Sequence, residues 1–312
     1  MSDPNFSIDL AAAVLRIGTP LILAALGELI LERSGVLNIG IEGVMLGGAF
    51  FGFWAGYASG SPYLGALAAM AVGAAFTLLL AALVLRVRAD QIVAGMALNL
   101  VALGVSNTAF SIVKRGVTMA GNADNFRAPK FGALFPNLTQ IPLLGPILCA
   151  QSVLTWAALF LVPVVWFYLQ RSERGMELRA VGENPEAAAA SGVDVRACRL
   201  KACLAAGLLG GLAGACLTLE FADTYAERCT AGRGFVALAA VVLGRYSTLG
   251  TAAACLFFGA TFAAQDRFQA AGWSIAPELL QMLPYAATVC VLALSLRRNT
   301  GAPAALGKPY VR

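Results

Sequence analysis

The sequence contains no histidine, and only 12% of its 312 residues are charged. The absence of histidine removes the side chain that proteins use most often as a metal ligand and as a general base. Soluble domains carry roughly 25% charged residues, so this low share argues against an ordinary water-soluble domain. No nucleophile–base pair and no metal-ligand cluster can be recognised. We therefore expect no catalytic site and no metal site in this chain.

Other motifs are also missing. The seven cysteines form no CxxC pair and lie mostly within apolar runs, which favours small buried side chains over disulfides or metal ligands. No G-x-x-x-x-G-K-[ST] phosphate loop is present, so the chain is not expected to be a P-loop ATPase. No Lys/Arg run is long enough for a nucleic-acid patch. The first residues, MSDPNFSIDL, lack the basic start of a cleaved signal peptide.

Hydrophobic residues, in contrast, make up 59% of the chain. They recur in apolar runs of about 20 residues, the length at which a helix crosses the hydrocarbon core of a bilayer. We place these segments at 9–31, 36–57, 63–86, 91–113, 142–169, 200–220, 234–243, 249–267 and 280–296. The predicted fold is all-α: a polytopic transmembrane helical bundle with about 8–10 membrane segments, including broken or half-helices. Residues 1–312 are expected to form a single membrane domain.

Two segments are short or interrupted by glycine. The segment 234–243, FVALAAVVLG, is too short to cross a core of ~30 Å at about 1.5 Å per residue, and it predicts a half-helix. GVLNIGIEGVMLGG, from Gly35 to Gly48, is its counterpart in the N-terminal half. Paired segments of this kind occur where helices break at a transport pathway. Small residues also let packed membrane helices approach closely, and the sequence does not choose between these two explanations.

Basic residues indicate the orientation of the chain in the membrane. Arg and Lys residues concentrate in the polar segment from about 170 to 200, at residues 86 and 88, and at residues 297 and 298. Cytoplasmic loops carry an excess of Lys and Arg, so we expect these three sites and the C-terminus to lie in the cytoplasm. The same alternation places the N-terminus outside.

The polar stretch GENPEAAAASG, from Gly182 to Gly192, has the features of a short capped helix. Asn184 is a preferred N-cap, Pro185 suits the first helical position, and the helix dipole favours Glu186. Four alanines follow, and the final glycine is a natural stop. A helix of about two turns is not stable alone in water. We expect it to dock with its alanine face in a groove of another protein, the alternative being an ordinary interhelix loop.

Ionisable residues near the end of the first segment predict a structural ion-pair network. Glu28 and Glu32 stand at i and i+4, so two like charges share one helix face and need a cation between them. Arg33 or Arg245 could supply it. Glu28, Glu32 and Arg33 are therefore predicted to act structurally.

Several side chains within the membrane segments are candidates for the pathway. Asn38 and Glu42 are also at i and i+4, and burial in lipid would be costly, so they face the bundle or the pathway. Asn99 lies in an otherwise apolar segment, where it either joins helices or contacts substrate. The aromatic residues Phe50, Phe51 and Phe53 either line the pathway or lie at the lipid or the membrane interface.

Four stretches resemble a known transporter family. GENPEAAAASG is similar to the coupling helix of permease subunits of ATP-binding-cassette (ABC) importers. GELILERSGVLNIGIEGVMLGGAF at 27–50, QIVAGMALNL at 91–100 and GRGFVALAAVVLGRYSTLG at 232–250 resemble the branched-chain amino acid, simple-sugar and nucleoside permeases, and within them the nucleoside-type group. The stretches cover both halves of the chain in the expected order. Leu31 and the absence of proline near Ser247 depart from the pattern outside the core of the motifs.

The resemblance implies a non-enzymatic permease subunit of an ATP-driven importer in the bacterial plasma (inner) membrane. The residues implied to contact the ATPase are Glu183, Asn184, Pro185, Glu186, Ala187, Ala188 and Gly192. Implied partners are a second permease subunit, the same or related, ABC ATPase subunits that hold ATP and Mg²⁺, and an external substrate-binding protein. The chain itself is expected to hold no cofactor.

The implied substrate is a small neutral solute, a nucleoside or nucleobase, with a simple sugar as the alternative. A stand-alone, ion-coupled secondary transporter is the hypothesis from another class. Proton-coupled carriers usually place Asp, Glu or His within their membrane segments, and few such residues are present here.

Overall fold

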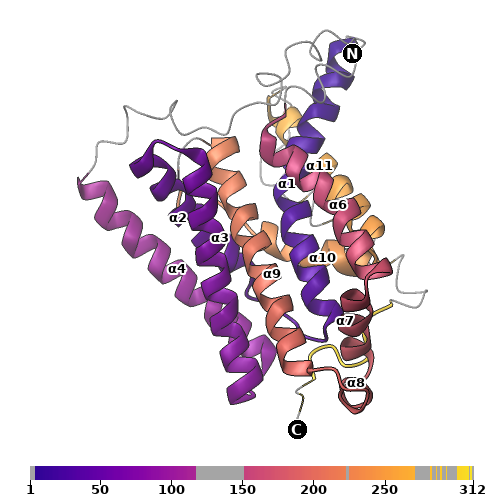
Figure 1. The fold of residues 1–312 in the computed structure, drawn as a ribbon. Helices are drawn as coiled ribbons and strands as arrows, with labels where there is room; N and C mark the ends of the chain where they lie inside the picture. The colour runs from indigo at the N-terminus through magenta and orange to yellow at the C-terminus, as the bar shows by residue number, and fades with distance from the viewer. Residues whose placement is uncertain are drawn as a thin grey trace.

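The computed structural model describes residues 4–116, 151–222, 225–270 and 301–308, together with residues 282, 286, 289, 293 and 310. The regular elements in these ranges are helices, packed as the predicted bundle (Figure 1). The α-helices are α1 (Pro4–Arg33), α2 (Ile41–Ser59), α3 (Pro62–Ala81), α4 (Gln91–Gly116), α6 (Val153–Arg171), α7 (Glu173–Glu183), α8 (Pro185–Ala190), α9 (Val195–Cys216), α10 (Arg233–Leu243) and α11 (Thr248–Ala270). Two π-helical segments, η1 (Ala82–Val87) and η5 (Leu217–Ala222), extend α3 and α9.

Six of the described helical segments are long and apolar enough to span a membrane: 8–33, 62–87, 91–113, 153–171, 195–220 and 248–269. The chain is thus a multi-pass membrane protein, as predicted. The structure also confirms α10 as a short helix, since it has only 11 residues. Apart from residues 282, 286, 289 and 293, the predicted segment 280–296 lies outside the described residues, and so does the start of the segment 142–169.

The predicted segment 36–57 begins later than expected. Residues 34–40 form turns, and α2 starts at Ile41 and runs for 19 residues. Gly35 adopts a φ of 88°, which favours glycine because a Cβ would be strained there. The break between α1 and α2 is therefore encoded in the glycine-interrupted stretch, but its position follows from packing inside the bundle.

Glycines hold α2, α3 and α9 in backbone contact at the centre of the bundle. A Cβ added to Gly211 of α9 would overlap the carbonyl oxygen of Ala69 in α3. A Cβ added to Gly214 would overlap the carbonyl oxygen of Met45 in α2. Small residues permit this approach, and close van der Waals packing is the main attraction between helices in lipid. Helix α4, at the edge of the bundle in Figure 1, packs mainly on α2 and exposes many of its apolar side chains.

The two ends of the bundle differ. The N-terminal end of α1 lies at one end, and α7, α8 and the last residues of the chain lie at the other (Figure 1). Residues 301–308 return to the α8 end, where the backbone N–H of Ala305 donates a hydrogen bond of 2.9 Å to the carbonyl of Gly182.

Candidate functional site

Glu42 links the starts of two helices that are far apart in the sequence. It lies in the first turn of α2, and its Oε1 and Oε2 accept hydrogen bonds of 2.8 and 2.7 Å from the backbone N–H groups of Gly232 and Gly234. N–H groups at a helix start lack partners within the helix and carry partial positive charge. The carboxylate therefore caps α10 and ties the N-terminal half of the chain to the C-terminal half.

The glycines of the GRG motif make this contact possible. Gly232 precedes α10 with a φ of 81°, a conformation that other residues adopt only with strain. A Cβ at Gly234 would lie 2.7 Å from the Cα of Glu42, which is too close for any side chain. The two helix starts can therefore meet only because both positions are glycine.

Asn99 braces the start of α2 from the neighbouring helix α4. Its Oδ1 accepts a hydrogen bond of 2.7 Å from the N–H of Gly43, and its Nδ2 donates one of 2.9 Å to the carbonyl of Ile39. The side-chain amide is thus bonded to the α2 backbone on both sides. Of the two roles considered for Asn99, the joining of helices is what these bonds provide.

The glutamates of the predicted ion-pair network are buried, and one of them has an amide partner. Buried Glu28 accepts a hydrogen bond of 2.7 Å at Oε1 from Nδ2 of Asn38, and Glu32 is buried beside it. Arg33 points away from both, because its Nε donates to the carbonyl of Tyr246 at 2.9 Å. Within the part of the chain that the structure describes, no ion pair joins Arg33 to either glutamate. The i, i+4 spacing identified the shared face correctly but not the partner, which is an amide.

A cavity of about 320 Å³ lies beside these contacts, between α2, α4 and the start of α10. Glu42 and Asn99 line it, whereas Asn38 is not among the lining residues. Arg228, Thr230 and Phe235 also line the cavity and were not singled out from the sequence. Phe235 lies in the stretch GRGFVALAAVVLG and could have been considered as a cavity-lining candidate from the sequence. No feature of the sequence around Arg228 indicates that it lines a cavity.

The backbone that leads into α10 is irregular. Residues 225–226 have no regular structure and residues 227–232 form turns, in which Arg228 and Ala231 have φ values of 59° and 45°. Such conformations cost energy in residues other than glycine and concentrate at functional sites. Within a membrane protein, non-helical backbone is tolerated where it is buried or lines a cavity, and this segment does line one.

The cysteine of this segment is protected from ionisation. Burial, partly opposed by the Arg233 guanidinium and assisted by the Glu42 carboxylate, raises the pKa of the Cys229 thiol to about 12. The thiol is therefore neutral at physiological pH.

The predicted pathway aromatics lie elsewhere. Phe50 and Phe53 are 1% and 2% exposed and pack in a buried cluster with Tyr225. The rings of Phe50 and Tyr225 meet edge to face, with centroids 5.1 Å apart. Phe51 is half-buried and packs against the same cluster. The burial of Phe50 and Phe53 contradicts the lipid-facing explanation for these two residues, and neither lines the cavity beside α10.

The short polar helix forms as predicted. Asn184 caps α8, its Oδ1 accepting a hydrogen bond of 3.0 Å from the N–H of Ala187. Pro185 occupies the first turn, and Gly192 follows the helix with a φ of 91°. Glu186, in the same turn, is exposed.

One residue of this helix faces inward. Ala188 is 5% exposed and packs against Val181 and Val195 of the same chain. It therefore anchors α8 to the bundle and does not belong to the docking face. The exposed residues Glu183, Glu186 and Ala187 form the outer face.

Comparison with known proteins decides the family. The family described as the branched-chain amino acid transport system / permease component matches residues 10–292 of this chain. The chain belongs to this family. It is a membrane-spanning permease of an ABC importer, and this permease acts with ATPase and substrate-binding partners.

Three relatives match the permease over nearly its whole length. The guanosine permease NupQ of Bacillus subtilis is 37% identical over 96% of this chain and 95% of its own length. The nucleoside permease NupC of Lactococcus lactis is 34% identical over 97% of this chain and 96% of its own length. The putative glucose permease TsgC13 of Haloferax volcanii is 33% identical over 99% of both chains.

Each of these organisms also has a second, more distant ABC permease that matches this chain. The match then covers only 67–69% of that second permease's length. No solved structure matches this permease.

Proposed function

We propose that this permease imports a nucleoside or a nucleobase, delivered to the complex by an external binding protein. Two of the three relatives described above are named for guanosine or nucleoside transport, and the third for glucose. The observation that carries the proposal is the cavity at the start of α10, because its chemistry suits a neutral solute.

The size and walls of the cavity fit a small flat molecule. Its volume of about 320 Å³ lies at the lower end of the range for ligand pockets, which begins near 300 Å³. Leu100, Leu103 and Phe235 contribute apolar wall, and Phe235 offers a ring on which a heterocycle can stack. Thr230, which is 2% exposed, brings a hydroxyl group to the lining. A sugar would use the polar groups but gain less from the ring.

The charges that line the cavity do not favour an anion, because the Arg228 guanidinium is matched by the Glu42 carboxylate and the lining carries no net positive charge. Helix starts attract phosphate and carboxylate groups, but the start of α10 is already occupied by the carboxylate of Glu42. A nucleotide would bring further negative charge to this carboxylate. A neutral nucleoside or base meets no such repulsion, and this is why we favour it over phosphorylated relatives.

We infer that α8 is the coupling helix through which an ATPase subunit moves this permease. The exposed face of α8 supports this role, since a helix this short depends on contacts at both faces. ATP and Mg²⁺ are then held by the ATPase, and the permease itself binds no nucleotide and catalyses no reaction. Closure of the ATPase cleft switches the pathway between outward and inward access.

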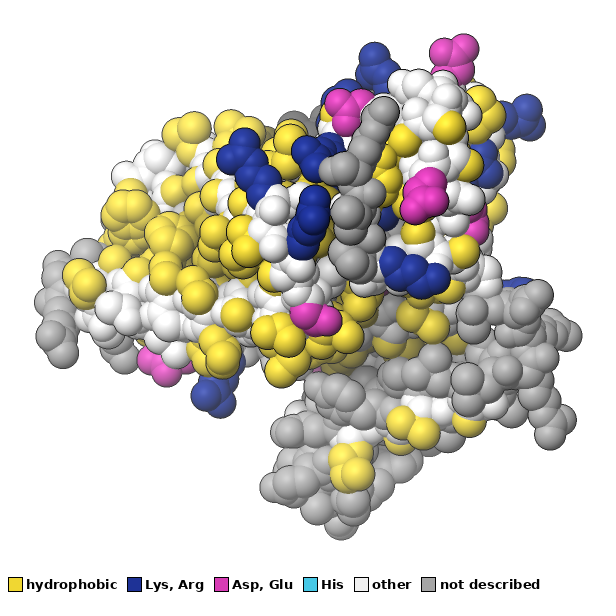
Figure 2. Space-filling model, turned by 90° about the horizontal axis from the view of Figure 1, so that it is seen from below, with side chains coloured by type: hydrophobic (Ala, Val, Ile, Leu, Met, Phe, Trp, Pro, Cys, Tyr) yellow, Lys and Arg dark blue, Asp and Glu magenta, His cyan; other side chains and the backbone are white. Residues whose placement is uncertain are grey.

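The end of the bundle that carries α8 is then cytoplasmic, with the C-terminus on this side and the N-terminus outside. Lys and Arg side chains gather on the α8 end (Figure 2), in keeping with the excess of basic residues in cytoplasmic loops. The membrane is then the bacterial plasma (inner) membrane.

The second permease of the complex is a different chain rather than a second copy. Each of three organisms has a permease that this chain matches over 95–99% of its length and a second one of which the match covers only 67–69%. By analogy, the partner here is a related chain with additional sequence. Co-expression of both genes and native mass measurement of the complex test this, and a stable complex with two copies of this chain would contradict it.

Uptake by the reconstituted complex tests the substrate. Labelled guanosine is supplied with the binding protein, and unlabelled nucleosides, nucleobases, glucose and leucine compete. We expect nucleosides or bases to compete and glucose and leucine to fail. Competition by glucose alone would show that the permease imports a sugar. That result would leave the proposed complex with the ATPase and the binding protein unaffected. Accumulation driven by an ion gradient through this chain alone would instead show a secondary transporter.

A further inference from the structure

The last described residues of the chain are bound firmly to the α8 end of the bundle. The N–H of Ala305 donates to the carbonyl of Gly182 at 2.9 Å, and the N–H of Gly307 donates to the carbonyl of Gly35 at 3.2 Å. The N–H of Ala304 also donates to the carboxylate of Glu183 at 3.3 Å. The tail thus joins the residues before α8 to the turn between α1 and α2.

Apolar contacts add to these hydrogen bonds. Ala305 is 6% exposed, and Leu306 packs against the main core of the bundle. Further along, Tyr310 packs on the small cluster formed by Val181, Ala188 and Val195. The tail is therefore a fixed part of the surface around α8.

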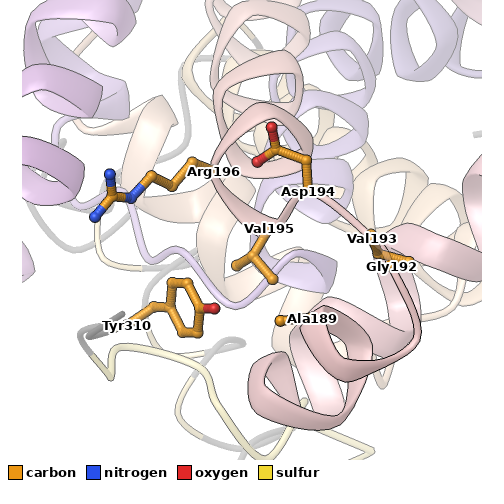
Figure 3. Close-up of a pocket in the computed structure, with 7 residues that line it drawn as sticks. All are labelled: Ala189, Gly192, Val193, Asp194, Val195, Arg196 and Tyr310. Carbon is orange, nitrogen blue, oxygen red and sulfur yellow. The ribbon is translucent and has the colours of Figure 1, made fainter.

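Tyr310 also forms one wall of a cavity of about 470 Å³ (Figure 3). Ala189 and Gly192 contribute from the end of α8, and Val195 and Arg196 from the start of α9. The cavity thus borders α8, the helix that we propose to dock on the ATPase.

The two charged side chains that line this cavity, those of Asp194 and Arg196, differ in whether they have a partner within the described part of the chain. Asp194 lines it, but its Oδ1 accepts a hydrogen bond of 3.0 Å from the N–H of Ala197 and so caps α9. Arg196 is exposed at the cavity and forms no ion pair in the part of the chain that the structure describes. A guanidinium group in this position suits a carboxylate, which it can bind through two N–H donors.

We propose that this cavity receives a segment of the ATPase subunit that carries an acidic side chain, so that the C-terminal tail and α8 bind the ATPase together. The proposal rests on the docking role proposed for α8, because the same residues border both. The acidic side chain binds Arg196, and an apolar part of the segment packs on Tyr310 and Ala189.

Photo-crosslinking of the complete complex in membranes tests this interface. A benzophenone amino acid replaces Tyr310, which keeps an aromatic ring in the cavity wall. The same probe at exposed Ala187 reports on α8. At Tyr63, which is 59% exposed in the first turn of α3, it serves as the control. We expect adducts with the ATPase from residues 310 and 187 and none from residue 63.

The outcomes separate the two proposals. An adduct from residue 187 without one from residue 310 would overturn the cavity proposal and leave the docking of α8 intact. Absence of both adducts would overturn both proposals. An adduct from residue 310 with lipid, with the second permease or with another copy of this chain, in place of the ATPase, would also overturn it.

A matched pair of charge reversals provides a second test. Arg196→Glu places like charges together, and we expect roughly tenfold weaker binding of the ATPase, with binding that no longer weakens as salt increases. Arg86→Glu makes the same charge change at an exposed residue of η1 and should leave ATPase binding unchanged. Equal binding by both variants would contradict the role of Arg196.

Discussion

Replacement of Glu42 by Gln isolates the charge at the contact between α2 and α10. The two side chains have nearly the same shape, so the cavity keeps its volume. In the parent protein both carboxylate oxygens accept N–H groups of α10, at 2.8 and 2.7 Å. In Glu42→Gln one of these acceptors becomes an NH₂ group that faces an N–H donor. One helix N–H then loses its partner, and the other bonds to a neutral oxygen.

The size of the effect follows from these two bonds. A hydrogen bond to a charged group contributes about 1.5–3 kcal/mol, and a neutral one about 0.5–1.5 kcal/mol. Loss of two charged bonds and gain of one neutral bond weakens the attachment of α10 by about 3 kcal/mol, allowing for partial exposure of Glu42. This corresponds to a shift of roughly two decades in the equilibrium between attached and detached α10.

Cys229 reports on this equilibrium, because it lies just before α10 and is partly buried. Removal of the Glu42 charge also lowers the pKa of Cys229, so labelling rates are compared per thiolate, with the thiol pKa of each variant taken from its pH profile. In a variant where Cys229 is the only cysteine, we expect maleimide to label Glu42→Gln roughly tenfold to a hundredfold faster than the parent on this basis. Uptake of substrate should fall in parallel. Glu186→Gln, the same change on the exposed face of α8, is the control and should label at the parent rate. Parent-like labelling and uptake in Glu42→Gln would refute the reasoning.

Three further predictions concern other regions. The pKa of Cys229 is raised to about 12, so its maleimide labelling rate should increase about tenfold per pH unit from ~7 to ~10. The labelling rate of an ordinary thiol of pKa ~8.5 levels off above pH ~9, and such a plateau for Cys229 would contradict its burial. Gly211→Ala should destabilise the bundle by about 1–3 kcal/mol through overlap with Ala69, and Gly104→Ala, with nothing within 4 Å, should not; thermal unfolding in detergent compares them. Ala188→Asp buries a charge inside the chain, so proteolysis near α8 should increase while the rest of the bundle stays resistant; unchanged proteolysis would show that this residue faces outward.

Features that depend on nearby residues were predicted well. The cap of α8 by Asn184 and its stop at Gly192 need only a few neighbouring residues, and both are present. The short length of α10 also follows from its own sequence. The six described spanning segments follow from apolar runs, because a membrane helix satisfies its backbone hydrogen bonds within itself.

Features that depend on distant contacts were not predicted. The partner of Glu42 lies 190 residues away, so the sequence indicated that this side chain avoids lipid but not that it caps another helix. The inward face of α8 at Ala188 is set by Val195 and by the tail residue Tyr310. The amide partner of Glu28 was not predicted, because a buried carboxylate can be satisfied by an amide as well as by a cation, and spacing alone does not distinguish them.

The glycine contacts among α2, α3 and α9 have a consequence for how force reaches the cavity. Where backbone touches backbone, as at Gly211 and Gly214, there are no long side chains between the helices whose rotamers could absorb a small displacement. Helix α9 begins in the short connection after α8 and contacts α2 along its length. With α8 as the coupling helix proposed above, a displacement of α8 is expected to move α9 and α2 together. Glu42 lies on α2, so its contact with the start of α10 is expected to move with them.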